Sequence, residues 1–402
     1  MIVLVLNCGS SSIKYQVIDI DDKSNALLAK GLVDRIGLSE GSLTHKPSGK
    51  DKYEVKLPIP DHTTGISLVL EALTDATHGV IKELNEIKAV GHRVAHGGEF
   101  FKSSALIDEQ AKENIRSLFD IAPLHNPANL EGVLSIEKVL PGVPQVGVFD
   151  TSFHQSIPAI NYLYALPEEY YNKYRVRKYG FHGTSHKYVA KIGAELCGLD
   201  LENSKIVTCH VGNGGSVTAV LNGKSFDTSM GFSPLDGLVM GTRCGSVDAS
   251  AITYIGENEG MSYAELNAMM NKKSGVMGMT GLSSDMRDID AAYDAGNEKA
   301  IVARDMYYNR VKKFVGEYAA EMGGVDLVIF TGGVGENSAD LRRYVCHNME
   351  FMGIELNDAV NDVTRGVNTI ISTPESKVKV AVIATNEELV IATDTYNLTK
   401  NL

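Results

Sequence analysis

The chain has 402 residues, a hydrophobic content of 44%, a charged content of 22% and a formal net charge of −12. This length suffices for two domains of ordinary size, each with its own core, and the composition is that of a soluble globular protein. The negative charge and the lack of a long basic run disfavour nucleic acid as a partner, because its phosphates would be repelled. A polyanionic ligand would need local neutralisation by a few cations, N–H groups and a divalent metal.

Cysteine usage and the N-terminus favour a cytoplasmic protein. The five cysteines form no C-x-x-C pair, which argues against a disulfide framework and against a structural zinc site. The first apolar run has five residues after Met1 and no basic flank, unlike a signal peptide. No segment approaches the ~20 apolar residues that span a bilayer. We therefore expect a protein of the reducing cytoplasm without a membrane partner.

The first predicted element is a strand, a turn and a second strand over residues 2–19. The apolar run 2–6 breaks at Asn7-Cys8-Gly9-Ser10-Ser11-Ser12 and resumes at 13–19. A hairpin that only turned would need one Gly beside an Asn or Asp, whereas small, hydrogen-bonding residues fill this whole stretch. Because glycine allows close approach of the backbone, such a turn can direct several N–H groups and hydroxyls at one anion. We interpret it as a phosphate-binding turn.

The rest of the first 150 residues is predicted to alternate strands and helices. Helices are predicted over 65–74, 108–119 and 129–139, and a buried strand over 145–149. This alternation favours an α/β fold with helices packed on a central sheet. Asp150 ends the buried strand, which is where acidic groups in such sheets meet ligands.

The pattern restarts in the second half. Residues 205–209, 210–216 and 217–221 form a second strand, turn and strand of the same kind. Helices near 262–271 and 297–322, a strand at 327–330 running into a Gly-rich turn at 331–338, a last strand at 378–383 and a terminal helix follow. We divide the chain into a first domain (1–150), a linker or lid (151–200) and a second domain (201–385). Part of the linker, residues 158–183, is rich in Tyr and Pro. The C-terminal helix 386–402 is expected to pack back on the first domain.

The repetition indicates duplication, with a ligand in the cleft between the two halves.

Two common nucleotide motifs are absent. Gly223-Lys224-Ser225 resembles the end of a P-loop, but Thr218 stands where its leading glycine belongs, and no G-x-G-x-x-G opens a helix after the first strand.

Three further segments bring arginine and histidine to predicted strand ends or loops: 91–98, 180–186 and 240–246. Arg93 and Arg243 are flanked by glycines and suit a carboxylate or a phosphate, because the guanidinium is a planar donor fork. His182 and His186 are four apart and could share a helical face, but no H-E-x-x-H glutamate accompanies them. A satisfied or phosphate-facing histidine is favoured over a zinc ligand.

Nine strings together resemble the acetate kinase family in the order of that family and over essentially the whole chain. They are N-C-G-S-S-S-I-K (7–14), G-H-R-V-A-H-G-G (91–98), F-D-T-S-F-H (149–154), Y-G-F-H-G-T-S-H (179–186), H-V-G-N-G-G-S (210–216), D-T-S-M-G (227–231), G-T-R (241–243), T-G-G-V-G-E-N (331–337) and T-N-E-E (385–388).

The resemblance implies the fold of the sugar kinase, Hsp70 and actin superfamily: α/β, with duplicated ribonuclease H-like (actin-like ATPase) domains that hold ATP in an interdomain cleft. It implies reversible transfer of the γ-phosphoryl group of ATP to acetate by direct in-line displacement, giving acetyl phosphate and ADP. Mg²⁺ is the implied metal, with Mn²⁺ as a substitute, and the implied assembly is a homodimer.

The resemblance also implies roles for individual residues. The catalytic set is Arg93, His125, Asp150, His182 and Arg243, and the residues near the metal are Asn7 and Glu387. The phosphates would lie near Ser10, Ser12 and Lys14 and at a second loop, His210, Val211, Gly212, Asn213 and Gly214. The adenosine part would lie at Asp285, Met286 and Arg287 and at Gly333, Val334, Gly335, Glu336 and Asn337. The acyl pocket would consist of Ala95, Leu124, Phe181 and Pro234, with Arg93 binding the substrate carboxylate.

The chemistry agrees with this set. A carboxylic acid has an ordinary pKa of about 4, so the substrate is already ionised at neutral pH and requires no strong general base. The reaction instead requires suppression of repulsion between two anions and stabilisation of an in-line phosphoryl transition state. We therefore predict that Asp150 mainly orients an arginine or a metal-bound water.

Two departures from the family pattern leave alternatives open. Ala95 stands where acetate-preferring members usually carry Val, which suggests that propionate is accepted and keeps a propionate or broad short-chain acyl kinase as the alternative. Cys244 and Ser246 stand where Ser and Asp are more usual, leaving one fewer acid and an oxidisable thiol beside Arg243. A non-enzymatic ATP-binding module of the actin or Hsp70 type would share the hairpins but would not need Arg93, His182 and Arg243.

Overall fold

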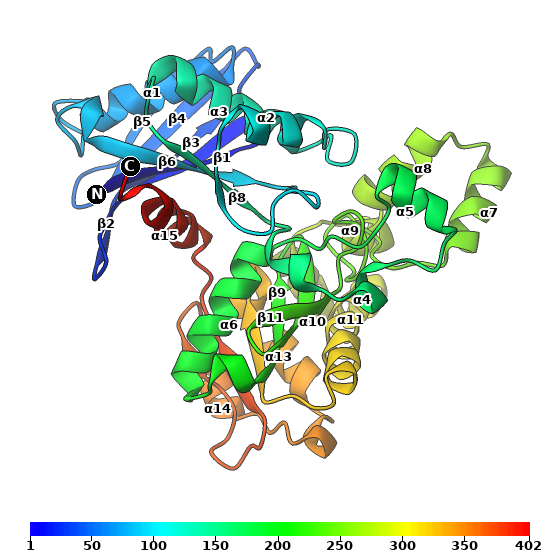
Figure 1. Ribbon diagram of the computed structural model, residues 1–402. Helices are drawn as coiled ribbons and strands as arrows, with labels where there is room; N and C mark the ends of the chain where they lie inside the picture. The colour runs from blue at the N-terminus through cyan, green and yellow to red at the C-terminus, as the bar shows by residue number, and fades with distance from the viewer. The chain divides into compact units, whose positions relative to one another are not determined.

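The computed structural model describes residues 1–402 and divides them into two compact units (Figure 1). Unit 1 comprises Met1–Ser152 and Asn386–Leu402, so the C-terminal helix belongs with the N-terminal segment. Unit 2 comprises Phe153–Thr385. Most of the segment 151–200, which we expected as a linker or lid, is therefore part of unit 2.

Unit 1 is built on one mixed sheet of eight strands. They are β1 (Ile2–Cys8), β2 (Ser12–Ile20), β3 (Asn25–Asp34), β4 (Gly41–Pro47), β5 (Tyr53–Leu57), β6 (Ile87–Val94), β7 (Ala105–Leu106) and β8 (Gln145–Phe149). The order is β5-β4-β3-β2-β1-β6-β8-β7, in which β1 to β5 form an antiparallel meander and β1, β6 and β8 are parallel. The expected alternation of strands and helices is wrong for the first sixty residues, where five strands follow one another. Strand β5 has no fully buried position, but its sequence Tyr-Glu-Val-Lys-Leu alternates apolar and charged residues, a strand pattern that our prediction did not include.

Helices cover both faces of this sheet. They are α1 (His62–Thr74), α2 (Glu109–Arg116), α3 (Asn126–Val139) and α15 (Glu387–Thr399), with a short 3₁₀ helix η1 (Leu84–Glu86). Leu4 and Leu6 of β1 share a core with α1 and α3, whereas Val3 and Val5 share one with α15. The first apolar run of the chain is continuous because β1 is buried on both faces. Helix α15 packs close to β6, since a Cβ on Gly91 would lie 2.4 Å from Thr395 Oγ1.

Unit 2 repeats the arrangement with six strands. They are β9 (Lys205–Val211), β10 (Gly215–Leu221), β11 (Lys224–Thr228), β12 (Leu327–Thr331), β13 (Thr369–Ile370) and β14 (Lys379–Val382), in the order β11-β10-β9-β12-β14-β13. Strands β9 and β10 form an antiparallel hairpin, and β9, β12 and β14 are parallel. A hairpin whose first strand begins a row of three parallel strands thus occurs once in each unit, which confirms the predicted duplicated α/β fold.

The helices of unit 2 include two that cover opposite faces of its sheet. Helix α6 (Gly183–Cys197) shares a core with Ile206 and Ile329, and α11 (Glu298–Glu321) shares one with Val207 and Val217. The other helices are α4 (Ala159–Tyr162), α5 (Glu168–Tyr174), α7 (Ala249–Glu259), α8 (Tyr263–Lys272), α9 (Gly275–Thr280), α10 (Met286–Asp294), α12 (Gly332–Asn337), α13 (Ala339–Cys346) and α14 (Asp358–Val363), with 3₁₀ helices η2 (Phe153–Ser156), η3 (Leu201–Asn203) and η4 (Glu350–Met352). None of the helices in the chain combines the length and the apolar character that crossing a bilayer requires.

Candidate active site

Three parallel strands of unit 1 bring together an arginine, an aspartate and an asparagine. Arg93 lies near the end of β6, Asp150 follows β8, and Asn7 lies near the end of β1. The Arg93 guanidinium donates to both carboxylate oxygens of Asp150, at 3.1 Å from Nε and 2.5 Å from Nη2. It also donates from Nη1 to Asn7 Oδ1 at 3.3 Å. Side chains at the carboxyl ends of parallel strands meet at one edge of a sheet, and these three do.

The Arg93 and Asp150 pair holds the arginine in one orientation. The Asp150 side chain is 3% exposed and that of Arg93 is 25% exposed, so little water competes for the two hydrogen bonds. The negative charge of Asp150 raises the pKa of Arg93 above its ordinary value, against the opposing effect of burial. Arg93 is therefore a fixed cation, and the geometry agrees with an orienting role for Asp150.

Glu387 begins helix α15, next to its N-cap residue Asn386, which accepts from Leu389 N at 3.1 Å. Burial raises the pKa of Glu387 above its ordinary value, and the charge of Asp150 adds to this effect while Arg93 opposes it. The structure contains no cluster of three or more His, Cys, Asp or Glu side chains of the kind that holds a metal. Mg²⁺ is nevertheless compatible with Asn7 and Glu387, because it prefers oxygen ligands and usually takes one or two carboxylates plus water and substrate phosphates.

The first predicted phosphate-binding turn joins β1 to β2. Gly9 N donates to Ser12 O at 2.8 Å, and His62 Nε2 lies 2.8 Å from Gly9 O, so α1 helps to hold the turn. Ser10 and Lys14 are exposed. Both can therefore reach a ligand at this turn.

Of the four residues predicted for the acyl pocket, Ala95 and Leu124 belong to unit 1, and Phe181 and Pro234 belong to unit 2. Ala95 is buried immediately after β6, while Leu124 is 66% exposed and precedes His125, the N-cap residue of α3. Phe181 is buried in unit 2, and Pro234 of the same unit accepts from Arg243 through its carbonyl.

Three histidines of unit 2 form a hydrogen-bonded group with hydroxyls. His182, at the N-cap of α6 with a φ of 57°, stacks on His210 with ring centroids 4.4 Å apart. Ser216 Oγ lies 2.9 Å from His182 Nδ1 and 2.7 Å from His186 Nε2. His210 Nδ1 lies 2.8 Å from Ser185 Oγ.

His186 is the satisfied core histidine that we favoured over a zinc ligand. Its second nitrogen, Nδ1, lies 2.7 Å from Thr208 Oγ1, and the ring is fully buried. Burial holds the pKa of His186 well below its ordinary value, so the ring is neutral. No role was predicted for Ser216 itself, although it closes the predicted turn 210–216.

Arg243 has no carboxylate partner. Its Nη1 donates to Pro234 O at 3.2 Å and lies 3.6 Å from Met240 Sδ. Burial lowers the pKa of Arg243. Ser246 Oγ instead donates to Asp236 Oδ1 at 2.7 Å, so this position contributes to the loop rather than to neutralising Arg243. Burial also raises the pKa of the Cys244 thiol, which disfavours the oxidation that we considered.

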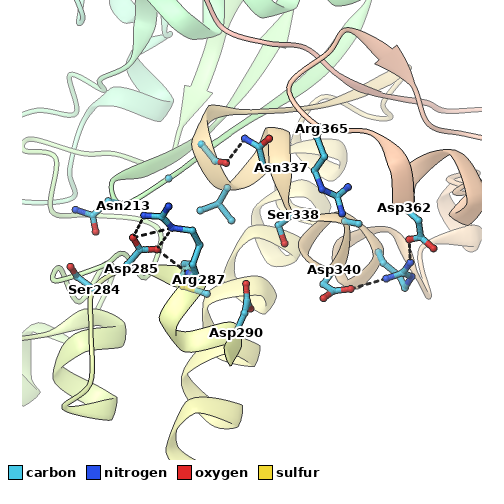
Figure 2. Close-up of a pocket in the computed structure, with 16 residues that line it drawn as sticks. Asn213, Ser284, Asp285, Arg287, Asp290, Asn337, Ser338, Asp340, Asp362 and Arg365 are labelled. Atoms are coloured by element: carbon cyan, nitrogen blue, oxygen red, sulfur yellow. Dashed lines mark hydrogen bonds and ion pairs between the residues drawn. The ribbon is translucent and has the colours of Figure 1, made fainter. Parts of the chain in front are cut away.

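A pocket of 1030 Å³ lies within unit 2 (Figure 2). Eight residues of the predicted nucleotide site line it: Gly212, Asn213, Asp285, Met286, Arg287, Gly333, Val334 and Asn337. Eight others that we did not predict complete the lining: Ser284, Asp290, Ser338, Ala339, Asp340, Arg343, Asp362 and Arg365.

Five predicted nucleotide residues of unit 2 do not line this pocket: His210, Val211, Gly214, Gly335 and Glu336. For Glu336 the reason is clear from its contacts. Its Oε1 accepts from Gly332 N at 3.0 Å and from Thr385 N at 3.1 Å, so the side chain fastens the turn at the start of α12. Gly332 has a φ of 78°, which favours glycine at this turn.

Asp285 and Arg287 form an exposed ion pair in the pocket wall. Asp285 caps α10 by accepting from Arg287 N at 2.9 Å, and the Arg287 side chain donates to both of its carboxylate oxygens. These bonds lower the pKa of Asp285 to about 2. The Arg287 side chain is 88% exposed, so the pair contributes little to stability and the guanidinium is free to reorient toward a ligand.

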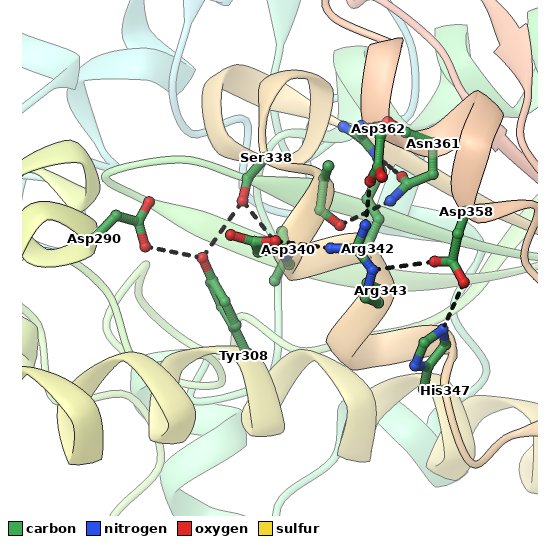
Figure 3. A network of polar contacts seen from close by, with 12 residues as sticks. Asp290, Tyr308, Ser338, Asp340, Arg342, Arg343, His347, Asp358, Asn361 and Asp362 are labelled. Atoms are coloured by element: carbon green, nitrogen blue, oxygen red, sulfur yellow. Dashed lines mark hydrogen bonds and ion pairs between the residues drawn. The ribbon is translucent and has the colours of Figure 1, made fainter. Parts of the chain in front are cut away.

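Behind the pocket, Arg342 of α13 is fully buried and all its partners are neutral oxygens (Figure 3). It donates to Gly335 O and Glu336 O at the end of α12, to Asn361 Oδ1 and O, and to Thr364 O, all between 2.7 and 3.0 Å. Burial lowers its pKa to about 10, so it remains charged at neutral pH. Arg342 thus joins α12 to the segment that carries Asp362 and Arg365. No sequence motif marked it, because it lies in an ordinary amphipathic helix.

The repeated hairpin and parallel strands define a two-unit α/β protein of the actin-like class. The chain belongs to the acetokinase family, whose model matches residues 2–393. The acetate kinase of Alkaliphilus metalliredigens is 52% identical over 398 residues, covering 99% of this chain and all of the relative. The resemblance seen in the sequence is therefore confirmed over the whole chain.

Solved structures of related kinases also match this chain over nearly its full length. The crystal structure of Porphyromonas gingivalis acetate kinase aligns with a TM-score of 0.95 at 49% identity and covers 99% of both chains. The crystal structure of a propionate kinase from Francisella tularensis aligns with a TM-score of 0.90 at 40% identity and also covers 99% of both chains.

Proposed function

We propose that this protein is a kinase that transfers the γ-phosphoryl group of ATP to acetate, giving acetyl phosphate and ADP, and that it catalyses the reverse reaction. The observation that carries the proposal is the match to acetate kinases over the full length of the chain. The fixed cation Arg93 and the uncompensated cation Arg243 support it, because the reaction brings a carboxylate to a polyphosphate.

Each reacting group has a protein counterpart in this proposal. Arg93, held by Asp150, binds the acetate carboxylate, and Arg243 and His182 stabilise the charge on the transferring group. A carboxylate oxygen forms a bond to the γ-phosphorus in line with the bond to the bridging oxygen, which breaks to release ADP. Since acetate enters ionised, no proton needs to be removed, and Asp150 and His125 act by orienting other groups.

The nucleoside part binds in the unit 2 pocket, whose volume of 1030 Å³ is ample for a nucleoside. The turns 9–12 and 210–214 hold phosphates through N–H groups and hydroxyls. Asn7 and Glu387 are the residues that would hold Mg²⁺, or Mn²⁺ in its place, and the metal would supply neutralisation of the phosphate charge.

Propionate is the second candidate substrate. Ala95 offers a smaller side chain than valine at a buried position after β6, and a propionate kinase is among the solved structures that this chain resembles over its full length. We propose that acetate is preferred and propionate accepted.

We propose that the protein acts in the cytoplasm as a homodimer. Large apolar side chains are exposed in two segments of unit 2, 160–174 and 247–263, with Tyr263 93% exposed. Sedimentation equilibrium at assay concentrations measures the assembly, and a monomer there would reject the dimer.

A hydroxamate assay with ATP, Mg²⁺ and a series of short carboxylic acids tests the activity. Acetate is expected to give the highest kcat/KM and propionate a lower but measurable one. A higher value with propionate would assign the protein as a propionate kinase. No acyl phosphate with any acid would leave only an ATP-binding module.

The two arginines give a second test. Replacing Arg93 or Arg243 by Ala should lower kcat/KM by about 1,000-fold or more, since each removes a charge that faces the transition state. Arg116→Ala, which removes an exposed arginine paired with Glu113 in α2, is the control. A loss under tenfold in Arg93→Ala or Arg243→Ala would exclude the assigned role.

A further inference from the structure

Two buried asparagines in the first turn of α3, Asn126 and Asn129, contact the backbone of the segment that contains the predicted acyl residue Ala95. They are three residues apart and so lie on one face of the helix. Both are almost fully buried. Neither belongs to one of the nine strings that carry the family resemblance.

The Asn129 amide continues the sheet where two strands end. The parallel pairing of β1 with β6 stops at Leu6 opposite His92. Beyond this point Asn129 Nδ2 donates to Cys8 O at 2.7 Å and Asn129 Oδ1 accepts from Ala95 N at 2.9 Å. One side chain therefore sets the separation between the start of the phosphate-binding turn and the backbone of Ala95.

The Asn126 amide pairs with the next residue in the manner of a neighbouring strand. Its Oδ1 accepts from His96 N at 3.1 Å and its Nδ2 donates to His96 O at 2.9 Å. On the other side, Asp150 N donates to Val94 O at 3.0 Å and Gly97 N donates to Thr151 Oγ1 at 2.9 Å. The backbone of residues 94–97 is thus hydrogen-bonded from both α3 and the end of β8.

We propose that Asn126 and Asn129 are positioning and specificity-determining residues that fix the backbone around Ala95 and thereby set which short acid fits. Asn126 acts on the acid site alone, whereas Asn129 acts on both the acid site and the phosphate-binding turn, because only Asn129 reaches Cys8. The inference rests on the proposed function. A buried amide with both groups bonded holds the backbone in one place, and a shift of about 1 Å at a reacting group lowers the rate about 100-fold.

Isosteric substitutions test the inference. Asn126→Asp removes the donor to His96 O, and Asn129→Asp removes the donor to Cys8 O, while each keeps the acceptor. Ser135→Ala is the matched control, because Ser135 is buried in the same helix and bonds Thr63 rather than the strand ends. For each variant, kcat and KM are measured for acetate, propionate and ATP, together with the midpoint of thermal unfolding.

We expect Asn126→Asp to lower kcat/KM for acetate by about tenfold or more and to change the acetate to propionate ratio at least about threefold, with KM for ATP within about twofold of the wild type. Asn129→Asp is expected to change the acid ratio and also to raise KM for ATP. Ser135→Ala should lower only the unfolding midpoint.

Unchanged acid ratios in folded Asn126→Asp and Asn129→Asp would overturn the inference while leaving the proposed function intact, provided that the wild type phosphorylates acetate. If these variants do not fold, Asn129→Ser and Asn126→Ser, which leave room for water, replace them. Failure of all four to fold would assign the asparagines to stability and also reject the inference. A wild type without acyl phosphate activity would instead reject the proposed function.

Discussion

At the scale of single residues, the two arginines of the proposed reaction differ in their surroundings. Arg93 donates to a buried carboxylate in a bidentate pair, whereas Arg243 has only a carbonyl oxygen and a thioether as partners. Pairing fixes the orientation of Arg93, but the nearby Asp150 carboxylate offsets part of its field, while no carboxylate offsets the field of Arg243. The first is suited to orient a carboxylate and the second to stabilise charge that develops.

Replacing Asp150 by Asn tests the orienting role. The amide has one acceptor oxygen, and its NH₂ group faces the Arg93 donors, so the bidentate pair is lost. We expect kcat to fall about 100-fold with no shift of its pH dependence. Steady-state assays across neutral and mildly alkaline pH measure both. Asp22→Asn, which removes an exposed carboxylate paired with Lys400, is the control.

The outcomes separate the two roles considered for Asp150. A rate equal to that of the wild type would remove any essential role. A loss that changes with pH would instead favour proton transfer by Asp150.

Replacing Ala95 by Val tests acid selectivity. Two added methyl groups at a buried position reduce the space for a longer acyl chain. We expect the ratio of kcat/KM for propionate to that for acetate to fall about tenfold, since one methylene is worth about 1 to 3 kcal/mol in an apolar pocket. The hydroxamate assay with both acids gives the ratio. A ratio within about twofold of the wild type would mean that Ala95 does not contact the acyl group.

At the scale of elements, short helices line the pocket, and side-chain hydrogen bonds hold them in place. Helix α12 has six residues and could not be stable alone, but Glu336 and Arg342 bond its two ends. The same Arg342 donates to Asn361 O in α14 and to Thr364 O just after it, so two walls of the pocket share one support. The position of these walls therefore depends on one buried guanidinium.

Replacing Arg342 by Met tests this support. Four carbonyl groups and an amide oxygen would lose their donor, and we expect the free energy of unfolding to fall by about 3 kcal/mol or more, since each buried acceptor left unpaired costs about 1 to 3 kcal/mol. KM for ATP should rise more than KM for acetate, because the wall of the unit 2 pocket shifts. Urea unfolding and steady-state kinetics measure the two effects, with Arg116→Met as the exposed control. An equal change of both KM values would contradict a role confined to the pocket.

At the scale of the whole molecule, each unit contains a buried histidine that is neutral in the folded state. Burial lowers the pKa of His92 in unit 1 to about 4 and that of His154 in unit 2 to about 4, and it holds the pKa of His186 well below the ordinary value. His92 Nε2 lies 2.7 Å from Gln145 Oε1, and His154 Nε2 lies 2.9 Å from Phe181 O. Proton uptake at these rings would oppose folding in both units.

The sign of the resulting pH dependence follows from the direction of these shifts. Below pH 6.5 the unfolded chain binds protons at these histidines and the folded protein does not, so stability falls as pH falls from 6.5 toward 4. Each histidine contributes up to about 1.4 kcal/mol per pH unit. Urea unfolding at neutral pH and at a pH about two units lower measures the loss of unfolding free energy. His92→Gln should make the free energy of unfolding less dependent on pH, whereas His347→Gln, at an exposed position, should leave the dependence unchanged. The same pH dependence in the wild type and both variants would contradict the assignment.

Much of the fold was predictable because it depends on local pattern. The strand 145–149 agrees with β8 to the residue, and the predicted helices 262–271 and 297–322 differ from α8 and α11 by one residue at each end. The roles assigned to the Gly-rich turns and to the glycine-flanked arginines stay predictions. The meander β3 to β5 was missed because its strands are half exposed and contain no continuous apolar run, although β4 and β5 do alternate more and less buried residues.

The sequence by itself determined the α/β class, the duplication and the chemical groups available for reaction, because periodicity and residue type are properties of neighbours in the chain. Only the tertiary structure decided that Asn129 bridges Cys8 and Ala95, that Ser216 bonds two histidines, and that Arg342 supports the pocket. These contacts join residues far apart in sequence, as between Asn129 and Cys8, which are separated by 121 positions. Their energy comes from burial, and burial exists only once the chain has folded.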